Sequence, residues 1–226
     1  MRDAHDPGAR HAPARLEITG LEVQRGERRL FTALDFAVAS GELLHVRGPN
    51  GCGKTTLLRA LCGLLLPQAG EILWNGEPIR RLAEDYTRDV LYLGHLNGIK
   101  HELTGVENLR VAATLDGDRV GDAAIWDALA RIGLAGFEDL PTLVLSQGQK
   151  KRVALARLFL TGARLWILDE PFVALDVRAV ALLESLIVAH VARGGIVVMT
   201  THQEVALTSG TIRTLDLGEA GRPRRG

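Results

Sequence analysis

The N-terminal part of the chain alternates apolar and polar side chains with the period of two that β-strands show. Residues 16–24 follow this alternation, and residues 30–40 form a second extended segment that ends at a Ser-Gly turn. Residues 42–47 are mostly apolar and end at a glycine, a pattern typical of a short buried strand. The chain is therefore expected to begin with extended segments.

A helix and a β-hairpin are predicted downstream of these strands. Residues 55–65 place leucines at helical spacing, which predicts a helix. Residues 71–74 and 77–79 flank the pair Asn75-Gly76, and both residue types readily adopt the positive φ angles of a type I′ turn. We therefore expect an antiparallel hairpin at this point.

The middle of the chain changes to the period of helices. In residues 122–132, Ile125 and Leu129 recur at helical spacing. Asp122 is a candidate N-cap because its carboxylate can accept a backbone N–H, and Gly133 is a candidate C-terminal stop. These features predict a separate helix in this part of the chain.

The order of the predicted elements indicates the fold class. Residues 104–159 are expected to be mostly helical. Strands return at residues 165–168 and 196–200, with a helix over residues 175–193 between them. Strands that alternate with helices are typical of a parallel sheet, so the sequence predicts an α/β fold with a helical lobe inserted into it.

The composition is that of an ordinary globular protein. Apolar residues make up 46% and charged residues 24% of the 226 positions, which is enough to build a hydrophobic core. The 27 basic residues equal the 27 acidic ones, so the overall charge gives no support for binding nucleic acid or an anionic membrane surface. A nucleic-acid partner is not expected.

The chain shows no segment suited to crossing or entering a membrane. No apolar run approaches the roughly 18–20 residues of a membrane-spanning helix. Residues 1–15 mix polar residues with Gly and Pro and lack the apolar stretch of a secretory signal. Cys52 and Cys62 fit a reducing compartment better than a disulfide framework. We therefore expect a soluble cytoplasmic protein.

Residues 48–55 match the spacing of a P-loop in full. Its glycines let successive backbone N–H groups turn toward phosphate oxygens. Lys54 can place its charge at the β- and γ-phosphates, and the Thr55 hydroxyl can ligate Mg²⁺. A strand before the loop and a helix after it complete the expected context. The candidate ATP-binding residues are Gly48, Pro49, Asn50, Gly51, Cys52, Gly53, Lys54, Thr55 and Thr56.

Two acidic residues follow the predicted strand 165–168. Asp169 and Glu170 would lie at the carboxyl end of a parallel strand, where open α/β sheets bind their ligands. Asp169 is a candidate ligand of Mg²⁺, and Glu170 is a candidate general base that polarises the attacking water. Two adjacent acids are also common in solvated loops, so the assignment depends on the P-loop upstream.

Residues 145–149 read Leu-Ser-Gln-Gly-Gln and precede a basic helix. Ser146 as N-cap and Gly148 for close backbone approach would make a second anion site at a helix N-terminus. The segment resembles the signature sequence of ATP-binding cassette (ABC) ATPases, which implies a head-to-tail dimer. In such a dimer the signature residues Ser146, Gln147, Gly148 and Gln149 would close on the ATP of the partner copy.

Two further positions agree with this resemblance. Asp176 follows Glu170 at the spacing of the D-loop, which implies a place at the dimer interface. His202 follows the strand 196–200 and resembles the switch histidine, which implies contact with the γ-phosphate and the attacking water. The resemblance covers roughly residues 16–217.

The ABC resemblance also sets the expected domain organisation. It implies a P-loop NTPase core of the ABC ATPase type, with an antiparallel β subdomain and a helical lobe at roughly residues 97–160. A single domain is expected over residues 15–219. Residues 1–14 and 220–226 are expected to be a flexible leader and a flexible tail.

The sequence departs from this family at two positions. Residues 23–26 lack the aromatic side chain that stacks on adenine in most relatives, and Arg25 is a possible substitute. His95 stands where relatives carry a glutamine at the start of the helical lobe. A histidine there could take a catalytic role, and its charge would make ATPase activity sensitive to mild acidification. Packing beside the site is the alternative role of His95.

The stretch 91–109, together with residues 165–171 and 194–197, resembles the haem-exporter ATP-binding subunit of bacterial cytochrome c biogenesis, the CcmA family. That resemblance implies ATP and Mg²⁺ as cofactors, a second copy of the chain as partner, and integral membrane subunits to dock on. It implies a peripheral location on the cytoplasmic face of the inner membrane. The histidines and cysteines are scattered, so haem is expected to meet the membrane partners rather than this chain.

Two other functions remain open at this point. The chain could be the motor of another small ABC exporter or importer. It could also be a soluble ABC-type ATPase in cofactor assembly or DNA maintenance, although it shows neither a basic face nor a long coiled-coil insertion.

Overall fold

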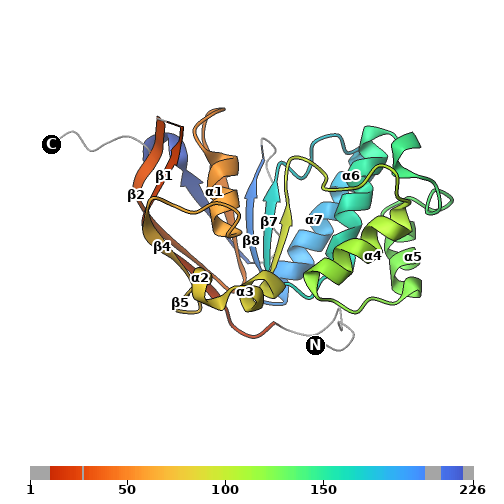
Figure 1. Cartoon of the computed structure of the whole chain (residues 1–226), viewed down its shortest axis with the longest axis horizontal. Coiled ribbons are helices and arrows are strands. Elements are labelled where there is room, and N and C mark those ends of the chain that lie inside the picture. The colour runs from red at the N-terminus through yellow and green to blue at the C-terminus, as the bar shows by residue number, and fades with distance from the viewer. Residues whose placement is uncertain (1–10, 27, 202–209, 221–226) are drawn as a thin grey trace.

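The computed structural model describes residues 11–26, 28–201 and 210–220. It contains an antiparallel sheet at one end, a parallel sheet in the middle and a group of helices at the other end (Figure 1). The α/β class with an antiparallel β subdomain is therefore confirmed. Among the described residues, no helix is both long and apolar enough to cross a lipid bilayer.

The antiparallel sheet has the strand order β2-β1-β4-β5. The hairpin between β4 and β5 turns at Asn75 and Gly76, whose φ angles of 54° and 84° are both positive. This confirms the turn that the Asn-Gly pair predicts. The strands are β1 (Arg15–Arg25), β2 (Arg28–Ala39), β4 (Ala69–Trp74) and β5 (Glu77–Pro78).

The second sheet has the order β6-β7-β8-β3-β9, and all of its neighbouring strands run parallel. Its strands are β3 (Glu42–Arg47), β6 (Val90–Leu93), β7 (Leu165–Asp169), β8 (Ile196–Thr200) and β9 (Thr211–Asp216). The sequence predicts the three central strands. The edge strands β6 and β9 complete the sheet without having been predicted.

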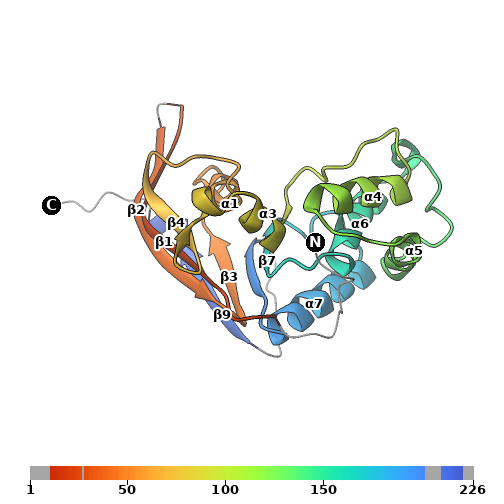
Figure 2. The ribbon, with the colours of Figure 1, turned by 60° about the horizontal axis from the view of Figure 1, so that its bottom comes forward.

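Helices cover the parallel sheet and extend beyond one edge. Helix α1 lies between the two sheets, and α4, α5 and α6 gather beyond β6 and β7 (Figure 2). Short 3-10 turns flank α6 at Thr142–Val144 and Ala156–Phe159. The helices are α1 (Lys54–Leu61), α2 (Ile79–Leu82), α3 (Glu84–Asp89), α4 (Gly105–Asp116), α5 (Asp122–Arg131), α6 (Gln147–Leu155), α7 (Val177–Ala192) and α8 (Leu217–Ala220).

The parallel sheet separates two hydrophobic clusters. Successive residues of β7 point to opposite faces, so Ile167 joins the cluster on the side of α1, whereas Trp166 and Leu168 join the cluster on the side of α7. Both faces of β7 are therefore buried. This explains why its sequence is a continuous apolar run rather than an alternating one.

Three local expectations need correction. The N-cap of α5 is Gly121, without a side-chain cap, and Asp122 instead lies in the first turn and pairs with Arg110 at 2.8 Å. Helix α1 ends at Leu61, because Gly63 takes a positive φ of 73° that no helix continues. Helix α7 begins at Val177, because Asp176 has an extended backbone and serves as its N-cap.

The expected flexible leader is partly ordered. The backbone N–H of His11 donates to the carbonyl oxygen of Arg193 at 2.9 Å, and Ala14 is buried. The ring of His11 also makes an edge contact with His190, at 5.1 Å between centroids. Residues 11–14 therefore pack on the end of α7, whereas residues 1–10 lie outside the described part of the chain.

Candidate nucleotide-binding and hydrolysis site

The P-loop links the end of β3 to the start of α1. Gly53 is the N-cap of α1, with a φ of 110° that disfavours side chains. A Cβ atom on Gly48 would lie 2.7 Å from the sulfur of Cys52, and one on Gly53 would lie 3.2 Å from Leu30. A side chain at either position would therefore be disfavoured, both by these contacts and by the φ angles of 142° at Gly48 and 110° at Gly53. The loop leaves backbone N–H groups and the positive end of the α1 dipole available to an anion.

Lys54 is the first residue of α1 and folds back over the loop. Its Nζ donates hydrogen bonds to the carbonyl oxygens of Gly48 at 2.7 Å and Pro49 at 3.4 Å. An ammonium group has three donors on a flexible stem, so it can turn from these carbonyls to phosphate oxygens. The geometry places a positive charge at the mouth of the loop.

Thr55 and Asp169 meet across the site. The Thr55 hydroxyl donates to one carboxylate oxygen of Asp169 at 2.7 Å, and the hydroxyl of Thr200 donates to the other at 2.7 Å. Asp169 is only 2% exposed, and these two donors hold its carboxylate in one orientation. Hydroxyl and carboxylate oxygens are the ligands that Mg²⁺ prefers, so this pair fits the cation.

The donor set also limits how a cation could be held. No group of three or more His, Cys, Asp and Glu side chains in the described part of the chain could hold a metal ion. Mg²⁺ commonly binds through one or two protein ligands together with waters and substrate phosphates. Thr55 and Asp169 therefore suit a cation that arrives with a nucleotide.

Glu170 has an unusual backbone conformation. Its φ is +50°, in the left-handed region that costs a non-glycine residue about 1 kcal/mol or more. Its N–H donates to the side-chain oxygen of Thr200 at 3.0 Å and to the Thr200 carbonyl at 3.2 Å. Such strain is common at active sites, and here it turns the chain sharply at the end of β7.

These groups surround one cavity of about 530 Å³. It brings together the P-loop, the two acidic residues, Arg25 and His95, which are distant in the sequence. His95 is exposed on the loop that follows β6. The cavity is lined by Arg25, Leu30, Asn50, Gly51, Gly53, Lys54, Thr55, Thr56, His95, Asp169, Glu170 and Val173.

Some of the predicted P-loop residues do not line this cavity. Gly48, Pro49 and Cys52 are absent from its lining. Cys52 is partly buried and packs against the hydrophobic cluster on the α1 side of the sheet. Its N–H donates to the carbonyl of Pro49 at 3.2 Å and so supports the turn of the loop.

The signature segment is also separate from the cavity. Ser146 caps α6 by accepting the N–H of Gln149 at 3.2 Å, and the side chain of Gln149 accepts the N–H of Ser146 at 2.9 Å. This capping box confirms the predicted N-cap. No residue from 146 to 149 is part of the cavity lining. The chain thus presents a capped helix N-terminus away from its own P-loop.

Asp176 stabilises the start of α7. Its side chain accepts the N–H of Ala179 at 2.9 Å and pairs with Arg152 of α6. The backbone hydrogen bond from Ala179 lowers the pKa of Asp176, and the positive charge of Arg152 adds to that effect. The predicted interface residue is therefore also an N-cap within its own copy.

The structure places two further residues, Thr200 and Lys151, in contact with the acidic residues, and neither was predicted from the sequence. Thr200 contacts both Asp169 and Glu170, and Lys151 reaches the carbonyl of Glu170 at 3.4 Å. The position of Thr200 at the end of β8 is the signal that could have identified it, because parallel strands end at the same edge. His202 lies outside the described residues.

Comparison with known proteins decides the family. The sequence profile of the ABC transporter family matches residues 31–173, more than half of the chain. A cytochrome c biogenesis ATP-binding export protein, CcmA, from Dechloromonas aromatica is 57% identical over 90% of this chain and 100% of its own length. The chain belongs to the ABC transporter family, in its cytochrome c biogenesis branch.

Other relatives agree with this family. The protein of the same name from Nitrosomonas europaea is 55% identical over 89% of this chain and 95% of its own length. The solved structure of an ABC transporter ATP-binding protein from Pyrococcus furiosus has a TM-score of 0.77 at 26% identity. The match covers 92% of this chain and 100% of the chain from Pyrococcus furiosus. As an ABC ATPase, the chain binds ATP and hydrolyses it.

Proposed function

We propose that this ABC ATPase drives a membrane complex that handles haem during c-type cytochrome biogenesis. The main support is the 57% identity to a cytochrome c biogenesis export protein over that protein's whole length. We infer that the cargo is haem from the resemblance of the sequence to the haem-exporter subunit. In this proposal haem contacts the membrane partners, and the chain sits on the cytoplasmic face of the inner membrane.

The proposed chemistry assigns roles in ATP hydrolysis to the P-loop, its Lys54 and Thr55, and the two acidic residues. The P-loop N–H groups and Lys54 hold the phosphates, and Glu170 accepts a proton from the water that attacks the γ-phosphorus. Thr55 and Asp169 would hold Mg²⁺, which would supply positive charge to balance that of the phosphates. The oxygen of that water bonds to the γ-phosphorus while the bond from the γ-phosphorus to the bridging oxygen breaks, and the products are ADP and inorganic phosphate.

Two histidines complete the proposed site. His95 lines the same cavity as Glu170, so it can contact the water or the γ-phosphate once ATP is bound. His202 is proposed to contact the γ-phosphate on the strength of its position after β8 in the sequence. Asp176 and the signature residues are proposed to lie at the interface with a second copy.

The dimer proposal rests on the position of Ser146. The capped N-terminus of α6 is suited to an anion, yet it takes no part in the lining of the chain's own cavity. A head-to-tail partner would supply the missing phosphate. Each ATP would then lie between the P-loop of one copy and the signature segment of the other.

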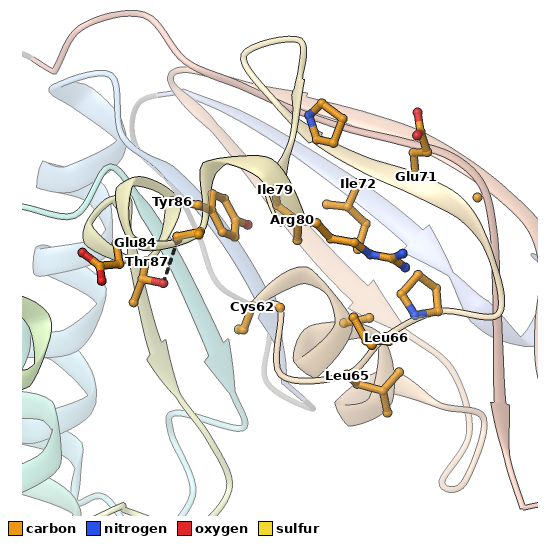
Figure 3. Close-up of a pocket in the computed structure, with 16 residues that line it drawn as sticks. Cys62, Leu65, Leu66, Glu71, Ile72, Ile79, Arg80, Glu84, Tyr86 and Thr87 are labelled. Carbon is orange, nitrogen blue, oxygen red and sulfur yellow. Dashed lines mark hydrogen bonds between the residues drawn. The ribbon is translucent and has the colours of Figure 1, made fainter.

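The proposed docking surface for a membrane subunit lies beside α1. A cavity of about 640 Å³ opens between the end of α1, the β4–β5 hairpin and helices α2 and α3, with Leu65 and Leu66 on one side and Ile72 on the other (Figure 3). Leu64 and Leu66 are 59% and 68% exposed, a strong exposure for large apolar side chains. Burial under an apolar partner segment would stabilise a complex by removing them from water.

A co-purification experiment tests this function. The full chain with Glu170→Gln, tagged and expressed with its neighbouring genes, should retain membrane proteins, and the haem absorbance should follow those proteins. Leu66→Arg should abolish this co-purification and leave ATP binding intact. Ile212→Arg is the matched control, since Ile212 is also an exposed apolar residue but lies on β9, at the other edge of the parallel sheet from β6. A complex that carries a different cargo would overturn the haem assignment, and a chain that never retains membrane proteins would overturn the transporter role.

A further inference from the structure

One face of α6 packs on the segment that follows β7. Gly148, Lys151 and Arg152 are spaced by three and four residues and therefore lie on the same side of the helix. A Cβ atom on Gly148 would lie only 2.9 Å from the carbonyl oxygen of Ala174. Arg152 pairs with Asp176. The signature helix α6 thus packs on residues 170–176, the segment that begins with Glu170, the proposed general base.

Among these residues of α6, Lys151 contacts Glu170 itself, the proposed general base. Its side chain is buried, with 6% exposed, and its Nζ donates a long hydrogen bond of 3.4 Å to the carbonyl oxygen of Glu170. Burial lowers the pKa of Lys151, and the negative charges of Asp169 and Glu170 oppose that change. A buried ammonium group needs such acceptors and charges to offset its lost hydration.

The peptide groups of Glu170 are held from both sides. Its N–H donates to Thr200, and its carbonyl accepts from Lys151 and, at 3.4 Å, from the N–H of Val173. Because the φ of +50° is unfavourable for glutamate, surrounding contacts must maintain it. Lys151 is the contact among these that comes from the signature helix.

The neighbouring Lys150 provides a matched comparison within the same helix. It is 7% exposed, and its Nζ donates to the carbonyl oxygen of Leu143 at 3.3 Å. Its burial and its kind of hydrogen bond match those of Lys151. The difference is the acceptor, because Leu143 lies in the turn before α6 and Glu170 lies in the hydrolysis site.

We propose that Lys151 is a positioning residue that couples the signature helix to the general base of the same chain. Movement of α6, when Ser146 meets the nucleotide of the partner copy, would pass through Lys151 to the backbone of Glu170. The position of each base would then depend on the occupancy of the other site. This inference rests on the proposed roles of Glu170 and Ser146.

The test compares two buried lysines by substitution in the full chain, purified through a tag together with its co-purifying membrane proteins. Lys151→Met keeps the length of the side chain and removes its charge and donors. We expect kcat to fall about 10-fold or more with a KM for ATP within about twofold of wild type, since only transition-state positioning is lost. Lys150→Met should keep a kcat close to wild type, and both variants should have similar melting temperatures.

Two further measurements separate positioning from general damage. Lys151→Gln, which restores a donor without a charge, should regain part of the lost kcat. In a Glu170→Gln background, Lys151→Met should cause little additional loss, because the base that it positions is already absent. A structural defect would instead lower the activity of both backgrounds by the same factor. If Lys151→Met does not accumulate as folded protein, Lys151→Gln replaces it in both comparisons.

The outcomes distinguish this inference from the function on which it rests. If Glu170→Gln itself leaves kcat unchanged, the assignment of the general base fails and the inference fails with it. If Glu170→Gln is inactive while Lys151→Met matches Lys150→Met, only the positioning role is overturned. Equal losses in the wild-type and Glu170→Gln backgrounds would overturn it as well.

Discussion

Thr55 donates a hydrogen bond to Asp169 at 2.7 Å, across 114 residues of sequence. Thr55 is the second residue of α1, and Asp169 is the last residue of β7. The contact shows that two motifs recognised separately in the sequence form one site. It also indicates which residues would hold Mg²⁺, because hydroxyl and carboxylate oxygens are ligands that this cation prefers.

Substitution of Thr55 should alter the requirement for Mg²⁺. Thr55→Val keeps the shape of the side chain and removes its oxygen, so we expect half-maximal ATPase activity to need roughly 10-fold more Mg²⁺ or higher. Thr55→Ser retains the hydroxyl and should stay near wild type. A Mg²⁺ titration of both variants measures this, and identical curves for valine and threonine would exclude Thr55 as a ligand.

Glu170→Gln should slow hydrolysis by about 10²–10⁴-fold, the usual contribution of a general base. Glutamine is nearly the same size but cannot accept the proton of the attacking water. ATP binding should be retained, because the P-loop and Lys54 remain. Single-turnover hydrolysis measures the chemical step, and equilibrium binding of a fluorescent ATP analogue measures affinity. Lys54→Ala is the contrasting variant, and it should lose binding.

A bulky thiol reagent on Cys52 should block ATP binding, because the residue lies within the phosphate loop. Its sulfur is only partly buried and packs toward Gly48, so a large adduct would distort the loop. Cys62 should react more slowly, since burial raises the pKa of its thiol well above the ordinary value. Labelling of a Cys62→Ala chain isolates Cys52. Full ATP binding after complete labelling would contradict the prediction.

Acidification should destabilise the fold through His190. Its ring is 1% exposed and stacks on Trp166 at 3.9 Å between centroids. Burial lowers its pKa to about 3, and the nearby His11 and Arg193 add to that effect. The unfolded chain binds the proton first, near pH 6.5, so stability is lost as the pH falls from there toward 3.

The size of this effect follows from proton linkage. At pH 5 the loss should approach about 2 kcal/mol of unfolding free energy relative to neutral pH. His190→Phe preserves the stacking and removes the titration, so its loss between pH 7.5 and pH 5 should be smaller. Urea unfolding of both chains measures the difference. Equal losses in the two chains would show that His190 does not contribute.

The sequence predicted the parts of the fold whose signals are local. The strand β7 is an uninterrupted apolar run, and the Asn75-Gly76 turn is specified by two residue types. Strand β6 was missed because four residues at a sheet edge carry too short a pattern. Strand β9 was missed because most of its side chains are exposed, so its alternation is weak. The predicted N-cap of α5, Asp122, is one residue after the observed N-cap, Gly121, because glycine is also accepted at that position.

The site residues likewise fall into those that the sequence could predict and those that it could not. The P-loop, Asp169 and Glu170 stand in recognisable order along the chain, and the structure brings most of the P-loop and both acidic residues to one cavity. The contact of Lys151 with Glu170 could not be predicted, because the sequence does not show which face of α6 meets the segment after β7. Residue spacing gives the helix, whereas tertiary packing selects the face.

Light scattering on the full chain tests the central claim that two copies share each ATP. With ATP and Mg²⁺, Glu170→Gln should have twice the mass of one chain, because ATP that is not hydrolysed keeps the two copies closed. The double variant Ser146→Arg, Glu170→Gln should bind ATP and remain a monomer. An ATP-bound Glu170→Gln monomer, or a dimer that forms equally well with Ser146→Arg, would contradict the account.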